Sequence, residues 1–470
     1  MLRLTHLTDA LWNPWLLGLF LLAGSWFSLR SGFFQLTGLG VWTKATLGTL
    51  WHPAGGRGGR GISQAQALCT ALASTIGTGS IAGVATAIWF GGPGSVFWMW
   101  VSAILGMMIS FVEKTLVICY RRRGGDGGWL GGPMYYLRDG LGSRGLAVWF
   151  ALACLCATFA GGNLVQASSI ASSMESAFGL GRCWVGGITA GTAALVMLGG
   201  IGRIAGISTL LVPVMAVLYV GGGVLVLILR GDRLPEAVGM IVSCALSPQA
   251  VLGGGAGYTI SSAMRFGIAR GVFTNEAGVG TSAMAHSAAD VDHPARQGMW
   301  GILEVGVSTL LICSVTALVI LVSGVYDPRQ GALGQIPACG LGAAMTTAAF
   351  SEVLGEPGGW VVAISLLLFA FSSILGWSYY GQQCIAFLTG REGGGRGYQL
   401  LFLLCILWGS MMDSTGVWVL VDFCNAMAAI PNMVGLLCLS GKSLSALEKW
   451  RQMEERKSFF KNRKKGVDIF

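Results

Sequence analysis

The sequence has few charged residues for its length. Only 11% of its 470 residues are Asp, Glu, Lys or Arg, whereas 53% are hydrophobic. An average soluble domain has about 25% charged residues. So few polar side chains cannot cover the surface of a soluble protein of this size. The composition therefore excludes a soluble enzyme or binding module and predicts a helical protein that crosses the membrane several times.

Cysteine supplies neither a regular metal-binding pattern nor a disulfide framework. None of the 12 cysteines forms a C-x-x-C pair, and most lie inside apolar runs, where they behave as small hydrophobic residues. The start of the chain lacks a charged region followed by a cleavage site, so no removable signal peptide is expected. The net charge of +9 arises largely between Lys442 and Lys465. A basic tail at this place favours contact with anionic lipid headgroups over nucleic-acid binding.

Apolar runs predict eleven membrane spans, each near the roughly 20 residues that cross a bilayer as a helix. The spans are residues 12–30, 64–90, 94–120, 146–176, 184–200, 207–230, 265–286, 298–323, 358–389, 398–412 and 416–440. A less apolar stretch, residues 236–252, is predicted to be a short surface or re-entrant helix. Placing the basic tail inside puts about 22 of the 30 Lys and Arg residues on the cytoplasmic side. This bias predicts an external N-terminus and a cytoplasmic C-terminus in the inner membrane.

Glycines interrupt the second predicted span at "GTGSIAG", residues 77–83. The letters satisfy a loose dinucleotide-binding fingerprint, but no alternation of strands and helices surrounds them. A helix-packing motif of small residues, Gly79-x-x-x-Gly83, is an alternative. Each glycine weakens a helix by about 1 kcal/mol, and backbone groups freed at membrane depth need a protein or cavity partner. We therefore favour a broken helix that lines a polar cavity.

A second interruption lies in the seventh span, where Asn275, Glu276, Gly278 and Gly280 follow one another closely. A glutamate at this depth is a functional residue or part of a buried pair by default. If the first span is set aside, each interruption begins a set of five spans, and the odd number gives the two sets opposite orientations. Paired interruptions in inverted halves indicate the central site of a secondary transporter.

The predicted organisation follows from these spans. It comprises an extra transmembrane helix and a cytoplasmic loop (1–63), a first five-helix repeat (64–230), an external loop with a short helix (231–264), a second inverted repeat (265–440) and a basic cytoplasmic tail (441–470).

Several long motifs resemble one known family. They are "GTGSIAGVATAIWFGGPGSVFWMW", "GGPMYYL", "GNLVQASSIA", "RGVFTNEAGVGTSAMA", "HPARQG", "LFAFSSILGWSYYG" and "VDFCNAMAAIPN". In this order, from about residue 64 to 440, they resemble the alanine/glycine:cation symporters (the sodium:alanine symporter family) of the amino acid–polyamine–organocation superfamily. The resemblance implies an all-α fold of the leucine-transporter type, with a five-plus-five inverted repeat, one extra N-terminal helix and two broken helices.

The resemblance also implies a substrate site between the two broken helices. Freed amides at the first break suit a carboxylate, and freed carbonyls at the second suit an amino group. Carried over to this chain, the substrate contacts are Gly77, Thr78, Gly79, Gln166, Phe273, Thr274, Asn275, Ser373 and Trp377. The indole of Trp377 would cap a small pocket that favours alanine or glycine. Taken alone, Gln166 fits an interhelical hydrogen bond and Trp377 fits packing.

For the coupling ion, the resemblance implies sodium held by the carbonyls of Ala73 and Ile76 and the hydroxyls of Ser372 and Ser373. Oxygen ligands alone are what a hard cation requires, and no other cofactor is expected. Taken alone, a Ser-Ser pair in a membrane helix more often bonds its own backbone carbonyls.

The function implied is sodium-coupled symport of alanine or glycine into the cell by alternating access, without enzymatic activity. The alternatives are a proton-coupled carrier of the same fold and a channel, which would need a continuous polar path. Two positions depart from the family pattern, because Ser80 stands where Asn is usual and Gln382 where Glu is usual. Glu113–Lys114 and His286 lie near the ends of their spans and are interpreted as interfacial.

Overall fold

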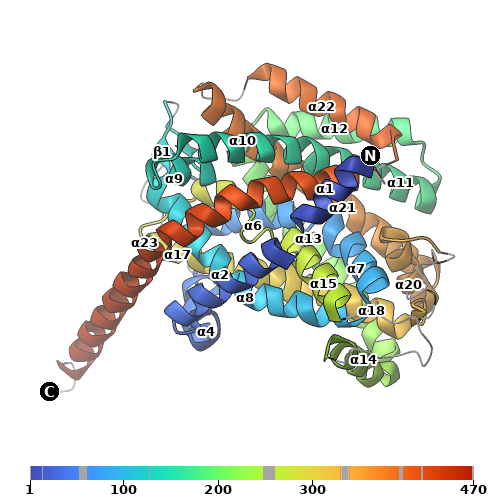
Figure 1. The fold of residues 1–470 in the computed structure, drawn as a ribbon, viewed down its shortest axis with the longest axis horizontal. Coiled ribbons are helices and arrows are strands. Elements are labelled where there is room, and N and C mark those ends of the chain that lie inside the picture. Colours follow the sequence, from blue (N-terminus) through green and yellow to red (C-terminus); the bar gives the residue numbers. More distant parts are fainter. Residues whose placement is uncertain are drawn as a thin grey trace.

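The computed structural model describes residues 2–467 except residues 13, 52–60, 126, 247–259, 329, 331–336, 338, 391–394, 414 and 415. Helices form almost all of the described chain (Figure 1). The sheet within it is one antiparallel pair of two-residue strands, β1 (Arg122–Arg123) and β2 (Trp129–Leu130).

The helices occur in three stretches of the sequence. The first contains α1 (Leu2–Leu11), α2 (Pro14–Arg30), α3 (Phe34–Thr37), α4 (Leu39–Ala45) and α5 (Leu47–Trp51). The second contains α6 (Gln64–Thr75), the π-helix η1 (Gly79–Gly83), α7 (Val84–Gly91), α8 (Gly94–Tyr120), α9 (Pro133–Asp139), α10 (Arg144–Phe159), the π-helix η2 (Ala160–Leu164), α11 (Val165–Phe178), α12 (Arg182–Met197) and α13 (Gly200–Leu229). The third contains η3 (Gly231–Arg233), α14 (Leu234–Leu246), α15 (Ile260–Asn275), α16 (Ala283–Ser287), α17 (Pro294–Val305), the π-helix η4 (Gly306–Cys313), α18 (Ser314–Ser323), α20 (Ala343–Leu354), α21 (Glu356–Thr389), α22 (Arg396–Met411) and α23 (Val417–Val467).

Each predicted span coincides with one helix or with a run of consecutive helices. Within the described residues, 6 helices are long and apolar enough to cross a membrane, or up to 7 if the bent pair Gln64–Thr75 and Gly79–Gly91 is one span. The short helix predicted within residues 236–252 corresponds to α14, and residues 247–252 lie outside the described residues. Helices α1 and α3–α5 occupy stretches for which the sequence predicted no helix.

The first predicted break is present. Ser63 begins α6 with a capping box, in which its hydroxyl accepts from the Gln66 amide and the Gln66 side chain accepts from the Ser63 amide. Helix α6 ends at Thr75, and Ile76 leaves the helical region with φ −83° and ψ 79°. The chain resumes at η1, and the two parts are bent by 54°. The glycines at 77 and 79 therefore mark a real interruption of the helix.

The second predicted break separates α15 from α16. Glu276 has φ +53°, and Gly278 and Gly280 have φ +81° and +97°. Glycine adopts this left-handed conformation without penalty, whereas a side-chain-bearing residue there costs about 1 kcal/mol or more. The strain at Glu276 indicates that its surroundings hold it firmly in place.

A short backbone bridge links the two broken helices at one end. The Ile62 amide, just before α6, donates to the Ala288 carbonyl (3.1 Å), and the Asp290 amide donates to the Ile62 carbonyl (2.8 Å). Residues 62 and 289 thus lie side by side like neighbours in a parallel sheet.

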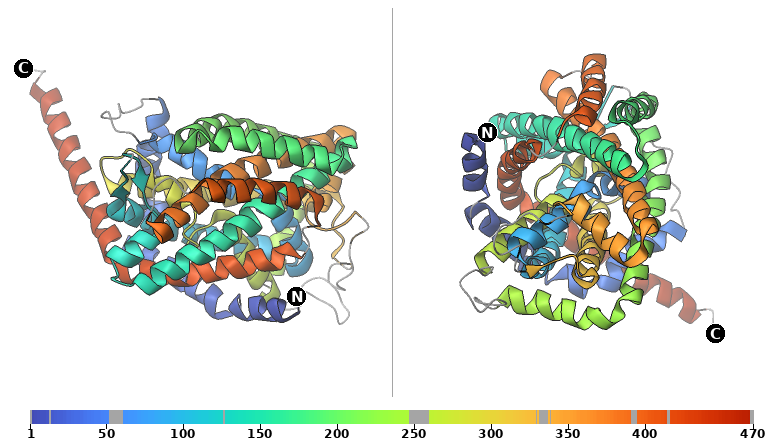
Figure 2. Two further views of the ribbon diagram at one scale, coloured as in Figure 1. Left: turned by 90° about the horizontal axis from the view of Figure 1, so that it is seen from above. Right: turned by 90° about the vertical axis from the view of Figure 1, so that its right-hand side faces the viewer.

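Two groups of helices pack against one another (Figures 1 and 2). In one group, α8 packs along both α15 and α17; in the other, α10 and α11 pack against α21, and α12 against α22. Large apolar side chains point outward from α12 and α13, with Trp184 79% and Leu210 70% exposed. An apolar exterior over internally hydrogen-bonded helices is what a bilayer requires. The long helix α23 extends beyond the bundle at its C-terminal end (Figure 2).

Candidate functional site

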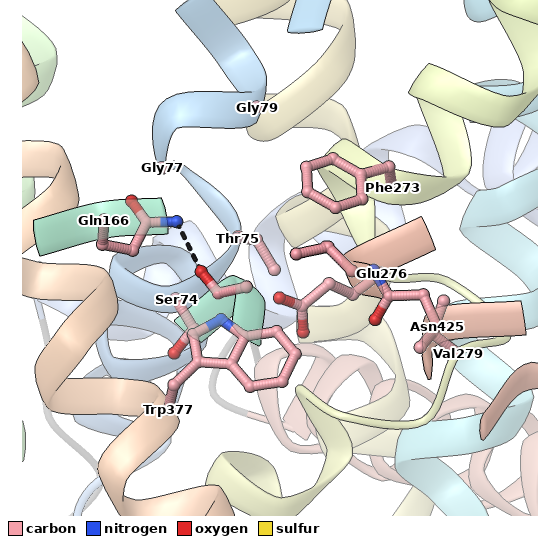
Figure 3. Close-up of a pocket in the computed structure, with 12 residues that line it drawn as sticks. Ser74, Thr75, Gly77, Gly79, Gln166, Phe273, Glu276, Val279, Trp377 and Asn425 are labelled. Atoms are coloured by element: carbon pink, nitrogen blue, oxygen red, sulfur yellow. Dashed lines mark hydrogen bonds between the residues drawn. The ribbon is translucent and has the colours of Figure 1, made fainter. Parts of the chain in front are cut away.

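A central cavity lies where the two breaks meet helices from both groups. The space between its lining atoms, counted together with the part open to solvent, is about 400 Å³. Its walls are formed by Ser74, Thr75, Gly77, Gly79, Gly161, Gln166, Phe273, Glu276, Val279, Trp377, Val421 and Asn425 (Figure 3). Of the predicted substrate contacts, Gly77, Gly79, Gln166, Phe273 and Trp377 line this cavity.

The glycines of the first break allow a close approach of other helices. A Cβ atom at Gly77 would lie 2.7 Å from the Ser373 hydroxyl oxygen and 3.4 Å from the Gln166 amide. A Cβ atom at Gly79 would lie 2.6 Å from the ring of Phe273. Both distances below 3 Å are too short for real Cβ contacts, so bare backbone is required at these two positions. The backbone amides of this segment are therefore not covered by side chains of their own.

Gln166 on α11 links the cavity wall formed by η2 and α11 to the first break. Its Nε2 donates to the Thr78 hydroxyl (3.2 Å) and to the Gly161 carbonyl (3.0 Å; Figure 3). Its Oε1 is buried and has no hydrogen-bond partner among the described residues. Gln166 therefore combines the interhelical bond expected of such a residue with an unused acceptor at the cavity.

Trp377 forms a rigid wall. A Cβ atom at Gly162 would lie 2.4 Å from the Trp377 Cβ, so α21 and η2 are in close contact. The indole also packs edge-on against Tyr380, with 5.5 Å between ring centroids. Val421 and Asn425 on α23 also line the cavity, with Asn425 beside Glu276 (Figure 3). Neither was predicted from the sequence, although Asn425 is a polar residue within an apolar span and could have been noticed.

At the second break, the structure separates the predicted residues. Phe273 lines the cavity, whereas the Thr274 hydroxyl donates to the Arg270 carbonyl of its own helix (2.7 Å). The Asn275 side chain accepts from the Ala277 amide (3.0 Å) and lines a different, smaller cavity beside Phe20 and Ser102. Glu276 lines the central cavity in its place, and its carboxyl group points toward the middle (Figure 3).

The residues predicted for the ion converge beside the first break. The hydroxyls of Ser372 and Ser373 each donate to the Ala73 carbonyl at 3.0 Å. Ser373 also donates to the Ser74 carbonyl (3.3 Å), and Ser372 to the Phe369 carbonyl of its own helix (2.9 Å). Ile76 lies buried at the end of the same helix. Both serines thus bond across to α6, so oxygen atoms of two helices meet at one point.

Next to the cavity lies a cluster of buried ionisable side chains, which includes Glu276 from the cavity wall. Among the described residues, the Asp, Glu, Lys, Arg and His side chains classed as buried are Glu113, Lys114, Glu276, His286 and Glu304. The Lys114 ammonium is 3.4 Å from a carboxylate oxygen of Glu113 and of Glu304, and it donates to the Ser282 hydroxyl (2.7 Å). The interpretation of Glu113–Lys114 and His286 as interfacial is therefore wrong, because these groups are 0% exposed.

This cluster holds the second break in its conformation. The Glu113 carboxylate accepts from the Gly278 amide (2.9 Å) and from the Asn432 side chain of α23 (3.3 Å). Asn432 also donates to the Gly278 carbonyl (2.9 Å) and accepts from the Tyr136 hydroxyl. Both polar groups of Gly278 are thereby satisfied by side chains, as a non-helical backbone away from water requires.

On the far side of the cavity, Arg270 and Asp422 join α15 to α23. Two guanidinium nitrogens lie 3.3 Å from the two carboxylate oxygens. The guanidinium also lies 5.8 Å from the centroid of the Phe273 ring and 5.9 Å from that of Trp418. The Arg270 guanidinium and the Trp418 ring thus pack against Phe273, which lines the cavity.

At both positions that depart from the family pattern, a buried side-chain polar atom has no hydrogen-bond partner among the described residues. The Ser80 hydroxyl is buried without a partner among the described residues, although its carbonyl accepts from Thr316 (2.9 Å). The Gln382 side-chain nitrogen is likewise buried without a described partner.

Comparison with known proteins places these features in a family. A model of the sodium:alanine symporter family matches residues 2–464. The sodium/alanine symporter AgcS of Methanococcus maripaludis is 40% identical over 452 residues, covering 95% of this chain and 96% of the relative. The amino-acid carrier protein AlsT of Bacillus subtilis is 36% identical over 414 residues, covering 87% and 83% of the two chains.

Among solved structures, the transporter MhsT in complex with L-phenylalanine superimposes with a TM-score of 0.58 at 14% identity. The match covers 81% of this chain and 89% of that one. At this identity the likeness concerns the fold alone, which is that of the leucine-transporter class.

Proposed function

Because the chain belongs to the sodium:alanine symporter family and is a multi-pass, cation-coupled amino acid symporter rather than an enzyme, we propose that it carries alanine or glycine into the cell together with sodium. The single observation that carries this proposal is the meeting of both helix breaks at one small cavity. A site of this kind can be opened alternately to either side, as a carrier requires.

The cavity suits a small zwitterion. The backbone at Gly77 and Gly79 has no side chain to cover it, and the start of η1 at Gly79 presents positive partial charge to a substrate carboxylate; the Gly77 amide itself donates to the Thr75 carbonyl (3.1 Å). The C-terminal carbonyls of α15 and the Glu276 carboxyl group present negative charge to the amino group. Trp377, Phe273 and Val421 line the rest of the cavity, and their bulk is expected to admit only a methyl group or a hydrogen atom as the substrate side chain. Thr78, Thr274 and Asn275 act by holding the two breaks in shape.

Sodium would replace two of the hydrogen bonds beside the first break. The hydroxyls of Ser372 and Ser373 now donate to the Ala73 carbonyl, and a cation between them would be held by the same oxygens with the Ile76 carbonyl. Such a site adjoins Gly77, so ion binding would fix the segment that binds the substrate carboxylate.

We further propose eleven transmembrane segments: one extra N-terminal helix followed by inverted repeats over residues 64–230 and 265–440. The agreement between the predicted spans and the helix bounds supports this arrangement. The distribution of Lys and Arg supports an external N-terminus and a cytoplasmic C-terminus.

The proposal is tested by uptake of labelled alanine into proteoliposomes with an inward sodium gradient. Uptake is expected to saturate and to cease when sodium is replaced by choline. In Ser373→Ala, the sodium concentration for half-maximal uptake is expected to rise about tenfold, equivalent to about 1.4 kcal/mol of ion-binding free energy.

Ser378→Ala is the matched control, because Ser378 is buried five residues further along α21 and donates to the Leu375 carbonyl of that helix (2.7 Å). Uptake that proceeds equally in choline would refute sodium coupling. An equal sodium dependence in Ser373→Ala and Ser378→Ala would show that sodium does not bind at this site.

Trp377→Leu is expected to broaden the substrate range. The smaller side chain opens the wall beside Gly162, so valine or leucine should compete with labelled alanine at concentrations at least about tenfold lower than in the wild type. Competition measured with a panel of amino acids checks this result. An unchanged order of competitors would show that Trp377 does not limit substrate size.

A further inference from the structure

The buried ionisable cluster has an imbalance of charge. It contains three carboxyl groups, from Glu113, Glu276 and Glu304, and one ammonium, from Lys114. With His286 neutral and all three carboxyl groups ionised, two negative charges remain uncompensated in the interior. Excess charge away from water is costly, so such a group of residues favours binding a positive charge.

His286 is the group placed to accept that charge. Its Nε2 lies 3.1 Å from the Glu304 carboxylate, on the same oxygen that faces Lys114. Its Nδ1 contacts the side-chain nitrogen of Gln297, so the neutral ring donates to Glu304 and accepts from Gln297. The other Glu304 oxygen and the Gln297 oxygen are buried without partners among the described residues.

Gln297 can serve both protonation states of the ring. In the neutral state its amide nitrogen donates to Nδ1. When a proton adds to Nδ1, rotation of the amide by half a turn presents Oε1, which now lacks a partner, as the acceptor. The proton is thereby accommodated without movement of any helix.

The surroundings of His286 contain few other charges. Helix α8 contributes Lys114 and Glu113, α17 contributes Glu304, and the segment before α16 contributes Glu276 and the Ser282 hydroxyl. Helix α6 carries no charged residue, and α21 contributes the phenol of Tyr380. Of these groups, Glu304 and Lys114 act most strongly on the imidazole, and the Arg121 guanidinium donates to the Ser287 and Ala289 carbonyls just after it.

We propose that His286 and Glu304 form a proton-binding site on the cytoplasmic side of the substrate cavity, and that the bound proton favours the closed arrangement of α16. The proton comes from cytoplasmic water and adds to Nδ1, while Nε2 keeps its hydrogen bond to Glu304. When α16 moves away and water enters, the cluster becomes solvated, its excess charge is no longer costly, and the proton leaves.

This inference rests on the proposed function and orientation, and it adds a regulatory ion to the symporter. It predicts that cytoplasmic acid slows the opening of the transporter toward the cytoplasm, because the protonated cluster stabilises the closed state. With all three carboxyl groups ionised, the direction follows from the charge count, since adding a proton reduces the buried excess from two negative charges to one.

The test is alanine exchange in oriented proteoliposomes with saturating sodium on both sides and a varied internal pH. In the wild type, exchange is expected to fall at least about fivefold as the internal pH drops from about 8.5 to about 5.5, across the range in which imidazoles titrate. In His286→Gln the change is expected to stay below about 1.5-fold. His293→Asn is the matched control, since position 293 begins α17 with a side-chain cap that asparagine preserves.

The outcomes separate the two proposals. No sodium-dependent uptake at any pH would overturn the proposed function. Normal uptake with a flat pH profile in the wild type, or the same profile in His286→Gln as in the wild type, would overturn the proton site alone.

A second measurement covers the case in which His286→Gln fails to fold. NMR of protein labelled only at histidine follows all 4 imidazoles through a pH titration. The signals of His6, His52 and His293 are assigned with one asparagine variant each, which identifies His286 by elimination. A buried imidazole that takes up a proton between about pH 5 and pH 9 in the substrate-free protein is expected. A His286 signal that does not change over this range would overturn the proposal.

Discussion

Replacement of Lys114 by methionine is expected to destabilise the folded protein by about 3–5 kcal/mol, because it leaves buried carboxylates without their cation. The ammonium lies within 3.4 Å of both Glu113 and Glu304, and all three side chains are 0% exposed. Methionine has nearly the same length, so the loss reflects charge rather than volume. Equilibrium unfolding in mixed detergent and SDS measures the change.

Two further variants define the origin of the effect. Lys442→Met is the matched control, because this lysine lies on the exposed surface of α23, over the ring of Tyr120; it is expected to cost less than about 1 kcal/mol. Combining Lys114→Met with Glu304→Gln is expected to restore at least about half of the lost stability, because one carboxylate is neutralised. A Lys114→Met protein as stable as the wild type would show that the cluster is already neutral.

Gly77→Ala is expected to reduce sodium-driven alanine uptake at least about 100-fold, equivalent to about 2.7 kcal/mol of transition-state stabilisation. The added methyl group would lie 2.7 Å from the Ser373 hydroxyl oxygen and in contact with the Gln166 amide. It would therefore separate the first break from both the proposed ion ligand and the opposite wall. Uptake at saturating sodium, corrected for the amount of inserted protein, measures the loss.

Gly83→Ala provides the comparison for this variant. Gly83 belongs to the same interrupted segment, but its added Cβ would meet only the Arg270 side chain, at 3.8 Å, an ordinary contact. Uptake within about threefold of the wild type is expected there. If Gly77→Ala retained more than about a tenth of wild-type uptake, the first break would not be the substrate site proposed above.

The sequence predicted the helices and the two breaks well because these depend on local chemistry. Long apolar runs, Gly77 and Gly79, and the sequence from Asn275 to Gly280 all act on their own stretch of backbone. The helices α3–α5 were not predicted, since they are short and lie in a stretch read as a loop. Their formation depends on contacts with other parts of the chain, such as the packing of α4 on α17.

Side-chain directions at the site were less predictable than positions. Asn275 and Glu276 are adjacent in the sequence, and Glu276, which has a left-handed backbone conformation, lines the central cavity while Asn275 does not. The charged cluster was not predicted because its members come from three separate helices, α8, α16 and α17, and from the segment between α15 and α16. Glu304, a glutamate within the apolar stretch "WGILEVGVSTLL", was the signal that could have revealed a buried partner for Lys114.

The backbone bridge between Ile62 and residues 288–290 has a mechanical consequence. It joins Ile62, just before α6, to the segment after α16. Neither of these two ends can move away from the other while both hydrogen bonds remain. Parting them would break two backbone bonds, at about 1 kcal/mol each, before any path for substrate had opened. The bridge thus couples the two broken helices, so that α6 and α16 are expected to move together and not one after the other.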